Sequence, residues 1–78
     1  MPPIKEVKRK SSHITKIGLD YAIQEYRNKY NFLGTLVVKL PIEREKELIN
    51  LQPFYPKEKV VFDIDFIEKD EIKVQEMK

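Results

Sequence analysis

Two stretches of this chain carry apolar side chains at different periods, and together they restrict the fold to a combination of helix and sheet. Over residues 17–30 the apolar residues recur at i, i+3, i+4, i+7 and i+11, which places them on one stripe of an α-helix. They are Leu19, Ala22, Ile23, Tyr26 and Tyr30. Over residues 59–67 apolar residues occupy every second position, which is the period of a half-buried strand; they are Val60, Phe62, Ile64 and Phe66. Because each pattern buries one side only, we expect a helix packed on one face of a small sheet.

The remaining segments complete an α+β domain with the order helix, strand, helix, strand, strand. Residues 35–40 are rich in β-branched and apolar side chains and predict a strand. Pro41 then suits the first turn of a second helix over residues 42–51. Residues 72–77 alternate again and predict a return strand at the end of the domain.

The connections between these segments predict a small mixed sheet. Strands 35–40 and 59–67 are separated by a helix-length crossover, so they could pair in parallel. Strands 59–67 and 72–77 are expected to form an antiparallel hairpin. A sheet of three strands has two open edges, which a homodimer or a partner protein could cover.

Length and the absence of cysteine limit how the chain can be stabilised. Seventy-eight residues make one domain, which we place at residues 13–78 behind an N-terminal arm of residues 1–12. Without cysteine there is no disulfide and no thiolate metal site, so stability must come from packing or from a partner. The absence of cysteine favours a reducing compartment, so we expect a cytoplasmic protein. No apolar run approaches the roughly 20 residues that a membrane span needs, and no membrane partner is expected.

Charge is distributed unevenly along the chain, although the formal net charge is only +2. Residues 1–16 carry five Lys or Arg against one Glu, whereas residues 40–78 carry seven Lys or Arg against ten Asp or Glu. Pro2 and Pro3 disfavour an early helix, so residues 1–12 are predicted to form a flexible basic arm. Such an arm binds phosphates by releasing counterions. The alternative is a terminus that only improves solubility and has no partner.

The first functional expectation is a small non-enzymatic protein that binds nucleic acid. The phosphate contacts are expected from the arm and from the first helix, through Lys5, Lys8, Arg9, Lys10, Lys16, Arg27 and Lys29. Lys39 extends this path if it shares their face of the domain. Phosphate contacts position a protein but do not read sequence, so neither DNA nor RNA is favoured.

The second expectation is a protein-interaction module, such as an adaptor or an inhibitor. Residues 53–56 hold Phe54 and Tyr55 between two prolines, and an exposed aromatic pair on a rigid loop suits protein docking. Tyr55 is the best candidate for an exposed aromatic. The acidic side of strand 59–67 or a sheet edge could serve the same purpose.

No pattern in the sequence is typical of a catalytic or cofactor site. Asp63 and Asp65 form a D-x-D pair that could bind Mg²⁺, but polar residues at alternate positions are also what the solvated face of a sheet requires. His13 is the only histidine, and neither glycine belongs to a phosphate-binding loop. We therefore expect no enzymatic activity, no cofactor and no small-molecule substrate; a metal-dependent nuclease is the least favoured hypothesis.

Overall fold

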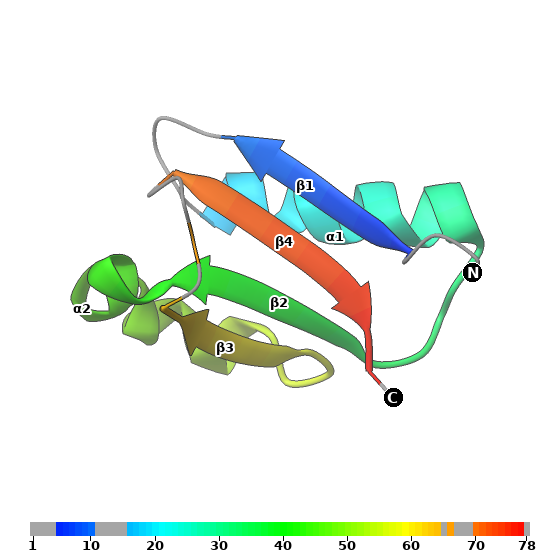
Figure 1. Ribbon diagram of the computed structural model, residues 1–78. Helices are drawn as coiled ribbons and strands as arrows, with labels where there is room; N and C mark the ends of the chain where they lie inside the picture. The colour runs from blue at the N-terminus through cyan, green and yellow to red at the C-terminus, as the bar shows by residue number, and fades with distance from the viewer. Residues whose placement is uncertain (1–4, 11–15, 65, 67–69, 78) are drawn as a thin grey trace.

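A four-stranded mixed sheet backed by one long helix makes up the computed structural model of the chain, which describes residues 5–10, 16–64, 66 and 70–77 (Figure 1). The sheet order is β1-β4-β2-β3, and the strands are β1 (Glu6–Lys10), β2 (Leu36–Pro41), β3 (Lys59–Asp63) and β4 (Glu71–Glu76). The helix α1 (Lys16–Tyr30) lies behind β1 and β4. Between β2 and β3 lie a 3-10 helix η1 (Ile42–Arg44), a short helix α2 (Glu45–Leu48) and a second 3-10 helix η2 (Ile49–Phe54). The predicted α+β class is confirmed.

The apolar stripe predicted from the sequence is the face that α1 presents to the sheet. Its buried members are Leu19, Ala22, Ile23 and Tyr26. The helix ends in a Schellman arrangement, because Asn31 has a φ of 51° and the N–H of Phe32 donates to the carbonyl of Arg27 at 3.2 Å. This turn brings the ring of Phe32 edge-on to Tyr26, with 6.1 Å between the ring centroids. The helix end is therefore fixed by backbone geometry and by an aromatic contact together.

The sheet contributes the other half of the core through alternate residues of its strands. The buried residues are Val7 from β1, Leu36, Val38 and Leu40 from β2, and Ile72 and Val74 from β4. Val60 and Phe62 of β3 are partly buried and pack against the same core. The predicted alternation is confirmed at these positions of residues 35–40 and 72–77 and, within residues 59–67, for Val60 and Phe62 only. Ile64, which the same pattern placed on the apolar side, is 75% exposed. Each strand therefore has one apolar side that packs into the core, and α1 covers this side of the sheet mainly over β1 and β4.

The N-terminal segment differs from the flexible arm that the sequence predicts. Glu6–Lys10 form strand β1, which pairs antiparallel with β4 so that Val7 lies opposite Val74. Without β1, the backbone groups on the side of β4 away from β2 would be unpaired. Val7 also packs into the core, where it is only 3% exposed. The other residues of the predicted arm, 1–4, 11 and 12, lie outside the described residues. The basic segment is thus an integral edge strand over residues 6–10.

The pairing of the last strand also differs from the expectation. The parallel pair of β2 and β3 is confirmed, but β4 pairs with β1 and β2 instead of forming a hairpin with β3. A central place covers β4 on both flanks, and its apolar residues Ile72 and Val74 are both fully buried there. At the edge of the sheet, beside β3, the same side chains would lose one flank.

The predicted strand over residues 59–67 ends at Asp63 in the structure, four residues before its predicted end. The predicted helix over residues 42–51 is interrupted. Within it only Glu45–Leu48 is α-helical, between two 3-10 segments. Leu48 is buried while Ile42 and Ile49 are exposed, so no continuous apolar stripe supports a regular helix.

Candidate functional site

The face of the sheet opposite α1, here called the open face, carries a row of three lysines. Residues that alternate with the core positions point to this face. In the strand register, Lys8 of β1 lies opposite Lys73 of β4, and Lys73 lies opposite Lys39 of β2. The next residue across, on β3, is Val61. We call Lys8, Lys73 and Lys39 the lysine row.

The lysine row concentrates positive charge across three neighbouring strands. Adjacent strands lie about 4.8 Å apart, so the three lysine stems span about 10 Å. Like charges directly opposite one another on a sheet are destabilising. Fold stability alone therefore does not account for three lysines at these positions.

Each lysine of the row has a different environment. The ammonium of Lys8 lies 3.8 Å from a carboxylate oxygen of Glu6, at the outer limit of an ion pair. The ammonium of Lys73 lies 4.7 Å from the ring centroid of Phe66, in cation–π geometry. Among the described residues, Lys39 has no hydrogen bond or ion pair to its ammonium group. Within the described part of the chain, the positive charge of the row is thus least compensated at Lys39.

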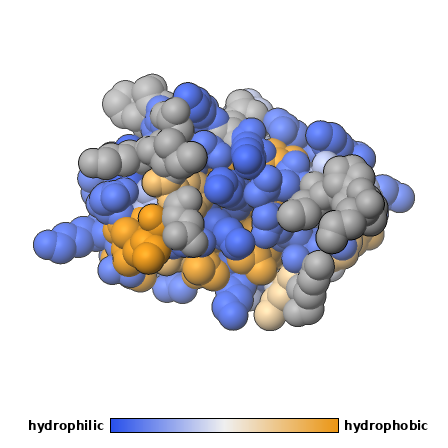
Figure 2. Space-filling view, in the orientation of Figure 1, coloured by the Kyte–Doolittle hydropathy of each residue, from blue (hydrophilic) through white to orange (hydrophobic). Residues whose placement is uncertain are grey.

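Residues on either side of the lysine row include both signs of charge. Gln75 donates to a carboxylate oxygen of Glu6 at 2.7 Å, which ties β4 to β1 on this face. At the other end of β1, Lys10 lies opposite Glu71. Figure 2, which views this face, shows hydrophilic residues over its middle and hydrophobic residues along the side of β3. The open face therefore has a basic centre and a mixed surround.

The cations predicted on the first helix do not belong to this face. Lys16 and Lys29 lie on α1, on the other layer of the domain. Lys16 pairs with Asp20 at 3.1 Å, and the ammonium of Lys29 lies 5.4 Å from the ring centroid of Tyr30. Lys5 also turns towards the helix, since its ammonium lies 5.9 Å from that ring. The predicted set of phosphate-binding residues therefore divides between two surfaces.

The side chain of Arg27 is largely buried in a network of hydrogen bonds and is not available as an exposed cation. Its guanidinium donates to the carbonyls of Phe32 at 3.1 Å and Gly34 at 2.9 Å, and it forms an ion pair with Glu58. The side chains of Arg27 and Glu58 are only 16% and 9% exposed. This network joins the end of α1 to the turn before β3, and it leaves the guanidinium turned inward.

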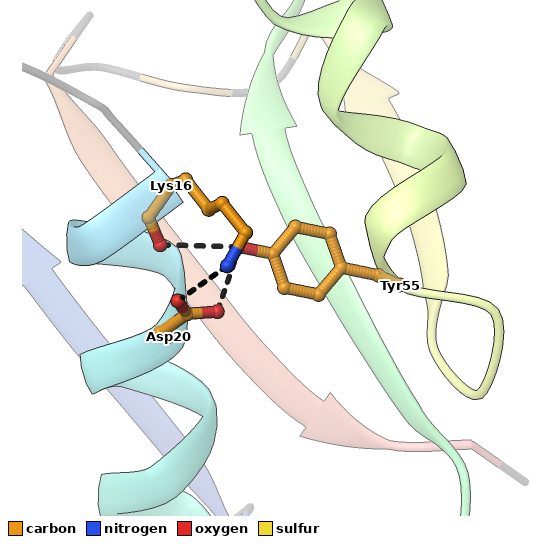
Figure 3. Close-up of polar contacts among 3 residues, drawn as sticks. All are labelled: Lys16, Asp20 and Tyr55. Carbon is orange, nitrogen blue, oxygen red and sulfur yellow. Dashed lines mark hydrogen bonds and ion pairs between the residues drawn. The ribbon is translucent and has the colours of Figure 1, made fainter.

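Tyr55 is buried, which contradicts its predicted exposure. Its side chain reaches α1 (Figure 3), where the hydroxyl donates to Oδ1 of Asp20 at 2.8 Å and lies 3.1 Å from the carbonyl oxygen of Lys16. Asp20 also receives the ammonium of Lys16 through its other oxygen. Burial, with this hydrogen bond, raises the pKa of Tyr55 well above its ordinary value. The tyrosine is an anchor between η2 and α1, because its ring is covered while its hydroxyl gains a carboxylate partner.

Phe54 remains exposed, as the docking expectation requires. Its residue exposure is 61%, and it borders an open hollow of about 580 Å³ between α1 and η2, which Leu33 and Lys57 also line. The predicted aromatic pair is therefore reduced to a single exposed ring.

Arg9 and the D-x-D pair, the remaining predicted residues, fall partly outside the described chain. The backbone of Arg9 pairs with Ile72 in β1, but its side chain lies outside what is described. Asp65 of the D-x-D pair also lies outside the described residues, and Asp63 is half-buried at the end of β3. Within the described part of the chain, no three His, Cys, Asp or Glu side chains are grouped as metal ligands.

Lys73 is the member of the lysine row that the sequence analysis missed. It lies in a segment of mixed charge, between Lys69 and Lys78 and among several carboxylates, and only its outward position on a strand distinguishes it. The three lysines form a row only because β4 pairs with both β1 and β2, and the alternation of residues along one strand does not predict which strands pair.

Comparison with family models, curated proteins and solved structures finds no match for this chain. No helix among the described residues has both the length and the apolar character needed to cross a bilayer.

Proposed function

We propose that this chain is a small non-enzymatic protein that binds nucleic acid through the open face of its sheet. The observation that carries the proposal is the lysine row, in which Lys8, Lys73 and Lys39 lie side by side on three adjacent strands. Repulsion between these ammonium groups is relieved when a polyanion lies across them. The phosphodiester backbone supplies negative charge at close, regular intervals and releases condensed counterions on binding.

The surroundings of the row define the kind of contact. The ring of Phe66 lies beside Lys73 on the same face, so an unpaired base has an aromatic surface near the phosphate contacts. Carboxylates of Glu6 and Glu71 flank the row and keep the basic area narrow. We therefore expect modest affinity, strong salt dependence and little sequence preference.

The proposal is tested by fluorescence anisotropy with labelled single-stranded and double-stranded DNA and RNA over a salt series. Three phosphate contacts give a slope of log affinity against log salt of about −2 on single strands and about −3 on duplex DNA. Lys39→Ala and Lys73→Ala should each weaken binding and make the slope shallower by about one contact. Lys57→Ala removes the same charge from an exposed position on the helix side of the domain, and it should bind like the wild type.

Point substitutions are preferable to deletion of residues 1–12. That deletion would remove β1, expose the edge of β4 and take Val7 out of the core, so lost binding would not separate a contact from an unfolded sheet. Equal binding by the wild type and the Lys39→Ala/Lys73→Ala double variant would contradict the proposal. No binding at low salt would also contradict it, and the expectation of a protein partner near Phe54 would then remain.

A further inference from the structure

The two edges of the sheet differ in their side chains. The edge strand β1 carries Lys8 and Lys10, and charged residues on an edge strand oppose pairing with a second chain. The other edge strand, β3, has the apolar residues Val60, Val61 and Phe62 at its centre, with a charge only at each end. Among the strands of the described chain, β3 has a neighbour on one side only, β2. An apolar edge of this kind is a template for a further strand.

The sequence of β3 is complementary to itself under a two-fold rotation. If two copies pair antiparallel about Val61, Lys59 of each copy lies opposite Asp63 of the other. Val60 then lies opposite Phe62, an aromatic–β-branched pair on the core side, and Val61 lies opposite its own copy on the open face. All five positions of the strand are thus matched by charge or by apolar character.

We propose that the chain forms a two-fold homodimer through antiparallel pairing of β3 with β3, which joins two four-stranded sheets into one. The same rotation applied to β1 would match Glu6 with Lys10, but it would place Lys8 opposite Lys8 at the centre and apolar Val7 opposite Arg9, so that edge is less self-complementary than β3. Parallel pairing of β3 in register would place Lys59 against Lys59 and Asp63 against Asp63. Charge therefore selects both the edge and the direction of pairing.

Dimerisation through β3 does not rest on nucleic-acid binding, and it is measured in the absence of nucleic acid. In the dimer the two open faces become continuous, with a lysine row on each side of the Val61 pair. A failure of the dimer would leave the lysine row of one chain unchanged, so the two proposals are tested separately.

The first experiment measures molar mass by light scattering and sedimentation over a concentration series. The wild type is expected at twice the chain mass of 9.4 kDa. Lys59→Asp places Asp against Asp at both ends of the interface and should weaken dimerisation by about tenfold or more. The double variant Lys59→Asp/Asp63→Lys restores opposite charges in reversed order and should recover the dimer. Lys57→Asp, the same charge change two residues earlier in an exposed turn, should leave the dimer intact.

The second experiment tests the register by disulfide formation, which is clean because the chain has no cysteine. Val61→Cys should give a dimer linked through residue 61 under mild oxidation, because residues facing each other on antiparallel strands have Cα atoms about 4.5–5.5 Å apart, within disulfide reach. Val37→Cys, on the same face but on the interior strand β2, should not. A monomeric wild type, unchanged dimerisation of Lys59→Asp, or equal cross-linking of the two cysteine variants would each overturn the proposal.

Discussion

Replacing Arg27 with alanine is the perturbation whose cost can be worked out most directly. The guanidinium of Arg27 donates to the carbonyls of Phe32 and Gly34 and pairs with the carboxylate of Glu58. Arg27→Ala therefore removes the donor from two carbonyls and leaves a carboxylate, 9% exposed, without its counter-charge. Arg27 is also one of the cations predicted from the sequence to bind phosphate, so the effect of its loss on stability separates the two roles.

The expected loss is large for a domain of this size. Removing one partner of a buried ion pair costs about 3–5 kcal/mol, and we take about 3 kcal/mol because some solvent reaches Arg27. A chain of 78 residues is expected to have a free energy of unfolding of about 4–12 kcal/mol. The corresponding fall in Tm is about 12–24 °C.

Urea and thermal unfolding followed by circular dichroism measure this loss. Lys29→Ala, an exposed cation two residues along the same helix, should change the free energy of unfolding by less than about 0.5 kcal/mol. The double variant Arg27→Ala/Glu58→Gln should be more stable than Arg27→Ala alone, because no unpaired carboxylate remains. A loss below about 1 kcal/mol for Arg27→Ala, the value typical of an exposed ion pair, would refute the reasoning.

Three further predictions concern the aromatic residues around the core. Tyr26→Phe removes a 2.7 Å hydrogen bond to the Glu76 carboxylate and should cost about 1.5 kcal/mol in thermal unfolding, whereas no loss would mean that water replaces the bond. Burial raises the pKa of both Tyr26 and Tyr55, so as the pH rises these hydroxyls lose their protons in the unfolded chain before they do in the folded chain. The free energy of unfolding should therefore be constant up to about pH 9. Above about pH 10 it should fall by up to about 1.4 kcal/mol per pH unit for each tyrosine. Urea titrations over that range measure the slope, and a flat profile would contradict the burial of both hydroxyls. Gly34→Ala would place a Cβ 2.6 Å from Cζ of Phe32 and should cost about 1–3 kcal/mol through displacement of that ring, so an unchanged Tm would contradict the close approach.

Local features of the fold follow from the sequence because they depend on neighbours within a few residues. The stripe of α1 is fixed by helical periodicity, and four of its five members are buried. The parallel pair of β2 and β3 follows from the length of the segment between them. These features use information that lies within one element or one connection.

The features that the sequence analysis missed depend on competition between distant segments. Whether residues 6–10 form an arm or a strand is decided by the free side of β4, a segment more than sixty residues away. Phe54 and Tyr55 are adjacent aromatics in the same loop, but only Tyr55 packs into the core and bonds Asp20 of α1, a contact that the local sequence does not contain. Arg27 and Lys29 are likewise both cations in the last turn of α1, but only Arg27 pairs with Glu58.

The central position of β4 has a consequence for how the chain acquires its structure. β4 is the pairing partner that links β1 to β2, and the pairing of Glu6 with Gln75 spans 69 residues of chain. During synthesis the first strands therefore have no neighbour between them until residues 71–76 have left the ribosome. Such long-range pairing slows folding and prolongs the exposure of apolar strands. The pair of β2 and β3 can form earlier, but β1 is expected to join the sheet only after residues 71–76 have been made.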